Sequence, residues 1–270
     1  MIVVPTSHGW LWVRRGFALF ARAPIGWILA AVSYWVLMTL IGIVPYLGIA
    51  AALVLTPVFS MGFMAICREV ERGRRLELPL LFAGFRTNLP ALVALGGIYL
   101  ALVLAVLGAT QIIDGGALMR WMLLGRGPAR GSPGADSVGE AAVLGCALFV
   151  PVILAFWFAP ALVAWHGQSA AKALFFSFFA ALRNWSAFLL YGVALAVVAG
   201  LAPGLAFSAL AVATQGAKGA AATIQLFALV VVVTLLPAIY ASIYASYRDV
   251  FPDDPPAPAD DQPATTQSSA

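Results

Sequence analysis

Residues 55–68, LTPVFSMGFMAICR, form an apolar run with a proline near one end and an arginine at the other. Two further stretches share this pattern, residues 158–172, FAPALVAWHGQSAAK, and residues 235–248, LLPAIYASIYASYR. The proline precedes the basic residue by eleven, twelve and eleven positions, which is about 16–18 Å of helix. Each stretch therefore predicts a helix that leaves a membrane about 30 Å thick, with its proline near the middle.

The composition of the chain supports a membrane location. Of its 270 residues, 63% are hydrophobic and 10% are charged, whereas about a quarter of the residues in a soluble domain are charged. The net charge is only +4, and no basic face with interleaved aromatic residues indicates nucleic-acid binding. We expect a multi-pass protein of a bacterial inner membrane whose partners are membrane lipids and, as an open alternative, other membrane proteins.

Charge-free runs predict an all-α fold, a polytopic bundle of six transmembrane helices with short interfacial helices between them. The turn-forming PYLG at residues 45–48 divides the first long run in two, and APGL at residues 202–205 is expected to end the fifth span. The spans are expected at about residues 25–44, 46–67, 88–110, 141–165, 184–202 and 222–247.

The predicted domain organisation has three parts: an N-terminal interfacial arm at residues 1–23, a membrane domain at residues 24–250 and a tail at residues 251–270. The arm mixes tryptophan and phenylalanine with arginine, as helices at a membrane surface do. The tail is acidic and rich in proline, so we expect it to be disordered. The longest polar stretch between spans is residues 114–140.

The distribution of basic residues predicts the orientation, because cytoplasmic loops carry an excess of lysine and arginine. With the N-terminus inside, eleven basic residues lie on inner segments and four on outer segments. Both termini are therefore expected in the cytoplasm. The inner residues are Arg14, Arg15, Arg22, Arg68, Arg72, Arg74, Arg75, Arg86, Lys172, Arg183 and Arg248, and the outer ones are Arg120, Arg126, Arg130 and Lys218.

Three similar words suggest an internal repeat: FALFAR at residues 17–22, FAGFR at residues 82–86 and FAALR at residues 179–183. Each precedes an outgoing span, and each returning span carries one of the proline stretches. The repeated unit would be an interfacial helix, a span out and a span back. The alternative is three independent hairpins, each with an aromatic anchor and an arginine.

The prolines of the returning spans, Pro57, Pro160 and Pro237, each remove a helical hydrogen bond. The hydroxyls of Thr56, Ser60 and Thr234 are near enough in sequence to help satisfy the freed carbonyl groups. One interpretation is that the three kinks surround a central, mildly polar pocket. The alternative, which we prefer, is that each kink only shapes packing.

Two further features have a functional and a structural interpretation. Arg68, Arg72, Arg74 and Arg75 could contact anionic lipid headgroups, but ordinary membrane topology already accounts for them.

Small residues form one stripe on the fifth span, from Gly192 to Gly200, and a second on the sixth, at Ala238, Ser242, Ala245 and Ser246. We interpret both stripes as packing faces between helices.

The spans contain no Asp, Glu, Lys or Arg in their interiors. Ion-coupled carriers usually place such groups there, and an enzyme needs a positioned acid, base, nucleophile or metal set. The two cysteines and two histidines form no metal-binding motif. We therefore expect no catalytic residues, no metal, no cofactor and no enzymatic activity.

The chain resembles a family of bacterial inner-membrane proteins with six spans, a family with no established activity. The resemblance is carried by GWLWVRRGFALF at residues 9–20, IVPYLG at residues 43–48, the proline stretch at residues 55–68 and SYRDVF at residues 246–251, together with LFAGFR and FAPALVAW. It implies the fold and the location, and no reaction. More loosely, the layout is similar to the membrane domain of some glycerophosphodiester phosphodiesterases, whose catalytic domain has no counterpart here.

Two hypotheses of function remain open on these grounds. The leading one is a non-enzymatic protein that binds or organises lipid or another hydrophobic molecule, or scaffolds a membrane complex. The alternative is a passive transporter or a permease-like subunit that takes its energy from a partner.

Overall fold

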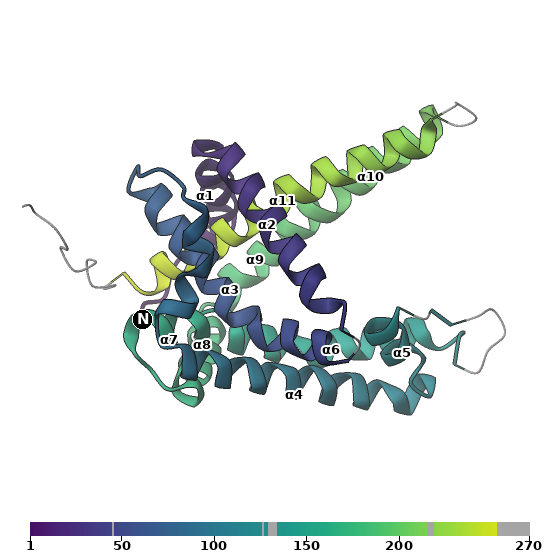
Figure 1. Ribbon diagram of the computed structural model, residues 1–270, viewed down its shortest axis with the longest axis horizontal. Helices are drawn as coiled ribbons and strands as arrows, with labels where there is room; N and C mark the ends of the chain where they lie inside the picture. The colour runs from purple at the N-terminus through teal and green to yellow at the C-terminus, as the bar shows by residue number, and fades with distance from the viewer. Residues whose placement is uncertain (45, 126, 129–133, 215–218, 253–270) are drawn as a thin grey trace, which may run out of the picture.

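The computed structural model describes residues 1–44, 46–125, 127–128, 134–214 and 219–252. This part of the chain is helical, with no β-strand, and it confirms the all-α class (Figure 1). Six stretches of helix within it are long and apolar enough to cross a membrane, as predicted. They are α2 (Pro24–Gly42), α3 (Leu47–Glu71), α4 (Leu89–Asp114), α6 with α7 (Val138–Phe156 and Ala159–His166), α9 with η2 and α10 (Trp185–Leu195, Ala196–Leu201 and Ala202–Ala213) and α11 (Ala220–Val250).

Four shorter helices connect these spans or precede them. Three of them carry the predicted interfacial segments, and the fourth, α5, belongs to the long polar stretch between α4 and α6. They are α1 (His8–Arg22), the 3₁₀ helix η1 (Leu78–Arg86), α5 (Ala117–Leu124) and α8 (Ala170–Arg183).

The fifth span continues well beyond the end that the APGL motif suggested. The helix runs through Pro203 to Ala213, and the turn directly before the proline, η2, is π-helical. A proline lacks the N–H that a regular α-helix uses, and a π-helical turn shifts the hydrogen bonding by one residue. The chain therefore passes the proline without leaving the helix.

The fourth span, in contrast, is interrupted. Helix α6 ends at Phe156 and α7 begins at Ala159, so that Pro160 lies in the first turn of a new helix. A proline is well tolerated in that position because the N–H of a first-turn residue has no partner within the helix. Pro57 and Pro237 lie inside continuous helices.

The hydrophobic core is concentrated at one end of the molecule. It joins the end of α3, all of α7 and the end of α11 to α1 and the start of α9. Its largest fully buried side chains include Trp12, Trp27, Phe59, Tyr191 and Tyr247. Toward the other end the spans separate, and in the fifth span only 6% of the most apolar window is buried. Figure 1 shows α10 and the start of α11 as a hairpin that diverges from α4 and α6.

Two of the short helices pack against proline-bearing spans through glycine. Helix α1 packs on α11, where Gly16 meets the backbone of Ala238, and η1 packs on α3, where Gly84 meets the backbone of Val58. Both contacted residues directly follow the proline of their span. Because glycine has no side chain, the two backbones approach closely.

The third short helix, α8, packs on α6 and α7. The Ser177 hydroxyl accepts a hydrogen bond from the N–H of Phe158 and donates one to the carbonyl of Leu154, each 2.9 Å long. Each short helix thus contacts the proline-bearing span that precedes it, and α1 contacts the last one. A ring of three like units would give this arrangement, but the internal repeat itself stays a prediction.

The two small-residue stripes differ in their surroundings. Ala238, Ser242, Ala245 and Ser246 are all buried, and α1 packs over this part of α11. Gly192 and Gly200 are exposed, with no atom of the described chain close to where a side chain would begin. The stripe on the sixth span therefore packs against another helix, as predicted. The prediction is wrong for the fifth span, whose glycines meet no other part of the described chain.

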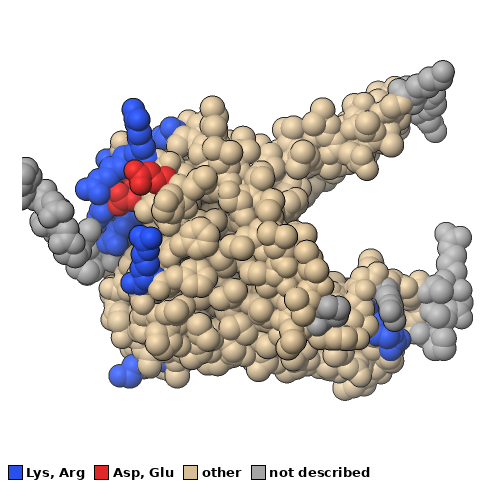
Figure 2. Space-filling model, in the orientation of Figure 1, with Lys and Arg blue, Asp and Glu red and all other residues tan. Residues whose placement is uncertain are grey.

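The two ends of the membrane domain lie on the same face of the molecule. The N–H of Ile2 donates a hydrogen bond of 2.9 Å to the carbonyl of Val250 at the end of α11. Figure 2 shows lysine, arginine and acidic side chains gathered at this end, while α5 at the opposite end carries Arg120. The other predicted outer residues, Arg126, Arg130 and Lys218, lie outside the described residues, as does the tail from residue 253.

Candidate functional site

The prolines proposed to frame a central pocket, Pro57, Pro160 and Pro237, are all buried. The residues that follow them belong to one hydrophobic core, where Phe63 stacks on Tyr240 at 4.4 Å and Trp165 meets Tyr244 edge-on at 6.3 Å between ring centroids. Aromatic side chains therefore fill the space between the three spans in the turns that follow the prolines. This packing is what the preferred interpretation of the kinks expects.

The three hydroxyl residues near the prolines do not converge on one site. Thr56 donates a hydrogen bond of 2.9 Å to the carbonyl of Ala52 in its own helix. Ser60 and Thr234 are half-buried on different helices, α3 and α11. The positions of Thr56, Ser60 and Thr234 therefore give no support to a polar pocket between the three prolines.

The four arginines considered for lipid headgroups are divided among other roles. Arg72 and Arg74 both form ion pairs of 3.0 Å with Glu69. The guanidinium of Arg68 lies over the Trp165 ring at 4.7 Å, a cation–π contact that joins α3 to α7. Arg75 is exposed in the loop after α3. The structure thus places two of the four in local ion pairs and a third in the packing of the bundle.

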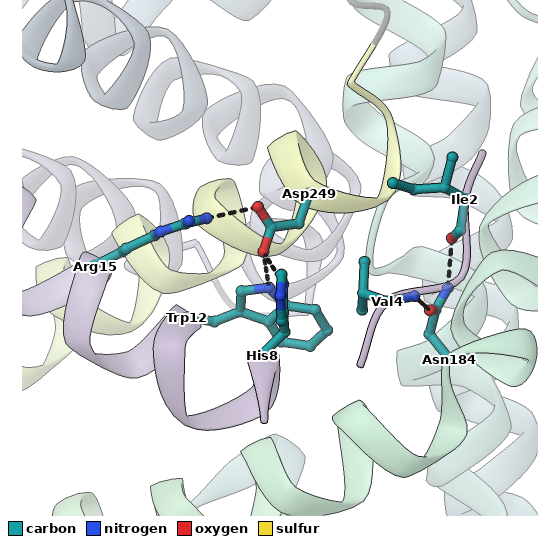
Figure 3. Close-up of polar contacts among 7 residues, drawn as sticks. All are labelled: Ile2, Val4, His8, Trp12, Arg15, Asn184 and Asp249. Atoms are coloured by element: carbon teal, nitrogen blue, oxygen red, sulfur yellow. Dashed lines mark hydrogen bonds and ion pairs between the residues drawn. The ribbon is translucent and has the colours of Figure 1, made fainter. Parts of the chain in front are cut away.

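The main polar cluster of the described chain is centred on Asp249, near the end of α11 (Figure 3). Its carboxylate accepts hydrogen bonds from His8 at 2.7 Å and from the Trp12 indole at 2.9 Å, and it pairs with the Arg15 guanidinium. All three partners lie on α1, at positions that share one helix face. The cluster fixes α1 across the end of α11.

A second contact holds the segment before α1. Asn184, between α8 and α9, is buried; its side-chain oxygen accepts the N–H of Val4 at 2.8 Å, and its amide group donates to the carbonyl of Ile2 at 3.1 Å (Figure 3). The Asn184 amide thus bonds to one backbone N–H and one backbone carbonyl of residues 2–4, as the backbone of a neighbouring strand would. The segment before α1 is therefore fixed to the bundle, with Val4 buried in the core.

The SYRDVF motif brings several elements to the end of α11. Ser246 accepts the Trp157 indole N–H at 3.1 Å, and the Tyr247 hydroxyl lies 2.8 Å from Nε2 of His166. Phe251, which we expected in the disordered tail, stacks on Tyr247 at 5.4 Å. These residues thus pack the end of α11 against α7 and the turn before it.

A small basic pocket, which we call the inner pocket, lies where α1, α3 and α11 meet at this end. Its volume is about 210 Å³. Arg15 and Arg22 line it from α1, Arg248 and Tyr244 from α11, and Glu71 from the end of α3. The Tyr244 hydroxyl donates a hydrogen bond to the Glu71 carboxylate, and Nε of Arg248 lies 3.7 Å from the same carboxylate.

A larger cavity of about 430 Å³, which we call the apolar cleft, lies between α2 and α11. It is lined by Ala31, Val32, Trp35, Val36, Thr39 and Leu40 of α2 and by Leu229, Val232, Val233 and Leu236 of α11. The Thr39 hydroxyl is already bonded to the carbonyl of Trp35 at 2.8 Å. Figure 2 shows the molecule deeply hollowed beside the diverging hairpin.

Sequence reasoning missed both cavities. Arg15, Arg22 and Arg248 were counted as topology signals, and α2 and α11 were not predicted to face each other. The i, i+4 and i+7 spacing of His8, Trp12 and Arg15 could have suggested one functional face on α1. No comparable signal marks the cleft, because its residues are ordinary apolar residues of two spans.

The fold and these contacts define an integral membrane protein with six apolar helices. The chain is 37% identical over 259 residues to a protein of Burkholderia thailandensis named "probable inner membrane protein", and the match covers 93% of each chain. The chain belongs to the family of this inner-membrane protein. No family model and no solved structure matches it, and the likeness to a phosphodiesterase membrane domain has no support.

Proposed function

We propose that this protein is a non-enzymatic inner-membrane protein that binds a hydrophobic molecule in the apolar cleft, with the acyl chain of a membrane lipid as its occupant. The observation that carries the proposal is the cleft itself, whose volume of about 430 Å³ lies within the range of about 300–1,000 Å³ typical of ligand sites. Its walls are segments of α2 and α11 that carry no charged residue.

The chemistry of the walls favours an acyl chain. Nine of the ten lining residues are hydrophobic, and the hydroxyl of the tenth, Thr39, is bonded within its own helix. A polar solute would therefore leave its hydrogen-bonding groups without partners, at a cost of several kcal/mol in an apolar site. Lipid tails are the apolar molecules that a bilayer supplies at this depth.

We further propose that both termini lie in the cytoplasm. The basic end of the molecule carries the N-terminal segment and the end of α11, and an excess of arginine is typical of cytoplasmic segments. Most of the α2 residues that line the cleft lie in the half of that helix farther from this end, so with this topology the cleft would open in the outer half of the bilayer.

Filling the cleft tests the proposal. Val36 is 54% exposed and lines the cleft, so Val36→Trp fills it without disturbing the core. We expect native mass spectrometry of the purified protein to show a several-fold loss of retained lipid. Val143→Trp is the matched control, because Val143 is 72% exposed on α6, away from the cleft. Equal lipid retention by both folded variants and the parent protein would contradict the proposal.

A passive transporter or permease-like subunit is the second candidate, and one observation favours it. The fourth span is broken between Phe156 and Ala159, and the fifth contains a π-helical turn. Interrupted spans and π-helical turns are frequent at the functional sites of membrane carriers. Solute flux into vesicles that contain the protein is the matching test. Native mass spectrometry of the protein drawn from membranes would show whether a partner protein is retained.

A further inference from the structure

The inner pocket combines three guanidinium groups from two helices that are distant in sequence. Arg15 and Arg22 are two turns apart on α1, and Arg248 lies opposite them on α11. We propose that this pocket binds a phosphate ester, presented by the headgroup of an anionic membrane lipid. The pocket is separate from the apolar cleft, so this inference goes beyond the proposed function and does not depend on it.

The charges around the pocket are not balanced within the described chain. Asp249 neutralises Arg15, and Glu71 is the nearest carboxylate to Arg248. Among the residues that the structure describes, Arg22 has no carboxylate partner, and its one hydrogen bond, of 3.4 Å, goes to the backbone carbonyl of Glu71. Within that part of the chain the pocket therefore keeps one positive charge in excess, and that charge belongs to Arg22.

The available donors suit a phosphate group. The Tyr244 hydroxyl is bonded to the Glu71 carboxylate, which leaves guanidinium N–H groups as the donors that face the pocket. Guanidinium groups bind phosphate oxygens through paired, charge-assisted hydrogen bonds. At about 30 Å³ for each water molecule, a pocket of about 210 Å³ has room for a hydrated anion or a phosphate ester.

The position of the pocket favours a lipid over a free anion. It lies beside α1, an amphipathic helix that buries Trp12 and Leu19 and carries the exposed arginines Arg14 and Arg15. Such helices lie at the level of lipid headgroups. The cytoplasmic leaflet is rich in anionic lipids, which attract basic residues at this depth.

The lining of the pocket is also amphipathic. Ala18 and Leu19 of α1 and Ala245 of α11 line it together with the arginines. An anionic headgroup could thus contact guanidinium groups while its glycerol carbons lie against these small apolar side chains. The loop arginines Arg72 and Arg74 offer no such surface, because both pair with Glu69.

For the test, each purified variant is placed in phosphatidylcholine nanodiscs that contain the same amount of phosphatidylglycerol. The quantity measured is the phosphatidylglycerol that remains bound to the protein. We expect Arg22→Gln to lower the bound phosphatidylglycerol about tenfold, since it removes the excess charge. Arg22→Lys, which keeps the charge and loses the planar donor pair, is expected to give an intermediate loss.

Arg14→Gln is the matched control, because Arg14 is an exposed arginine on the same helix that does not line the pocket. Thermal unfolding of each variant verifies that it is folded, and Arg248→Gln provides a second variant from the opposite wall. Loss of phosphatidylglycerol in Arg22→Gln and Arg248→Gln, with none in Arg14→Gln, supports the proposal. Equal retention in all folded variants, or an equal loss in Arg14→Gln, would overturn it.

A second arm separates the lipid from a soluble ester. The protein in neutral detergent is titrated with glycerol 3-phosphate, and binding is followed by calorimetry. Weak or undetectable binding there, together with retention of phosphatidylglycerol in nanodiscs, assigns the pocket to a lipid headgroup. Tight binding of the soluble ester that is lost in Arg22→Gln would overturn the assignment to a lipid.

Discussion

Asp249 shows how one side chain can organise a membrane protein at its surface. Its side chain is only 14% exposed, and the carboxylate is shared by three donors on α1. A carboxylate at this depth needs such partners, because burying a charge without them costs several kcal/mol. The contact also neutralises part of the basic surface of α1, and Arg15 is thereby held at the edge of the inner pocket.

The substitution Asp249→Asn tests this role. It keeps the shape of the side chain and removes its charge, so that the donors on α1 lose an ionised acceptor. We expect a destabilisation of about 1–3 kcal/mol, seen as a fall of several degrees in the midpoint of thermal unfolding in detergent.

Glu77→Gln is the control for this change, because Glu77 is an exposed carboxylate in the loop before η1. It should leave the midpoint within experimental error. A midpoint for Asp249→Asn that equals that of the parent protein would show that the cluster does not hold α1 in place.

At the scale of whole helices, the packing of the short helices depends on close backbone contacts. A side-chain carbon added to Gly16 would overlap the carbonyl oxygen of Ala238, and one added to Gly84 would overlap that of Val58. Backbone atoms cannot move aside as a flexible side chain can. Helices in lipid associate through such small-residue contacts, because lipid tails are as apolar as leucine.

Gly16→Val should therefore separate α1 from α11. Overpacking a tight contact usually costs about 1–3 kcal/mol, and we expect faster hydrogen exchange in residues 1–22 as α1 loosens. Gly192→Val is the control, since Gly192 has nothing within 4 Å of the added carbon. Unchanged exchange in α1 of the Gly16 variant would refute the contact.

At the scale of the molecule, the main core and most of the charged residues that the structure describes are at one end, and the spans separate toward the other. Helix α11 has 31 residues and is about 46 Å long, well beyond a hydrocarbon layer of about 30 Å. A helix of this length is accommodated by tilting. The divergence of α11 from α4 in Figure 1 is consistent with such a tilt, and it opens the apolar cleft beside α2.

The topology gives a test of the whole arrangement. Reporters fused before Met1 and after Ala270 should both indicate the cytoplasm, and a reporter inserted at residue 128, between α5 and α6, should indicate the periplasm. Cysteine labelling with a membrane-impermeant reagent provides an independent check. Opposite locations for the two terminal reporters would contradict a bundle of six crossings.

The sequence by itself determined the membrane location, the helical class and the number of spans. These follow from charge-free runs of about twenty residues and from the breaks between them, which are local properties of the chain. The relation to a family of inner-membrane proteins was also visible in motifs such as SYRDVF. Local signals failed where neighbouring structure decided the outcome, as at Pro203, where a π-helical turn carries the helix past a residue that usually ends one.

Only the tertiary structure decided which residues come together. Asp249 lies more than 230 positions from each of its partners on α1, and Arg22 lies 226 positions from Arg248 in the inner pocket. The apolar cleft likewise depends on α2 facing α11. The hydrophobicity of a segment predicts that it forms a helix in lipid. These spans are almost equally apolar on every face, so hydrophobicity does not specify which neighbouring helix each face contacts. That choice depends on glycine contacts and paired polar groups, which become visible only when the chain is folded.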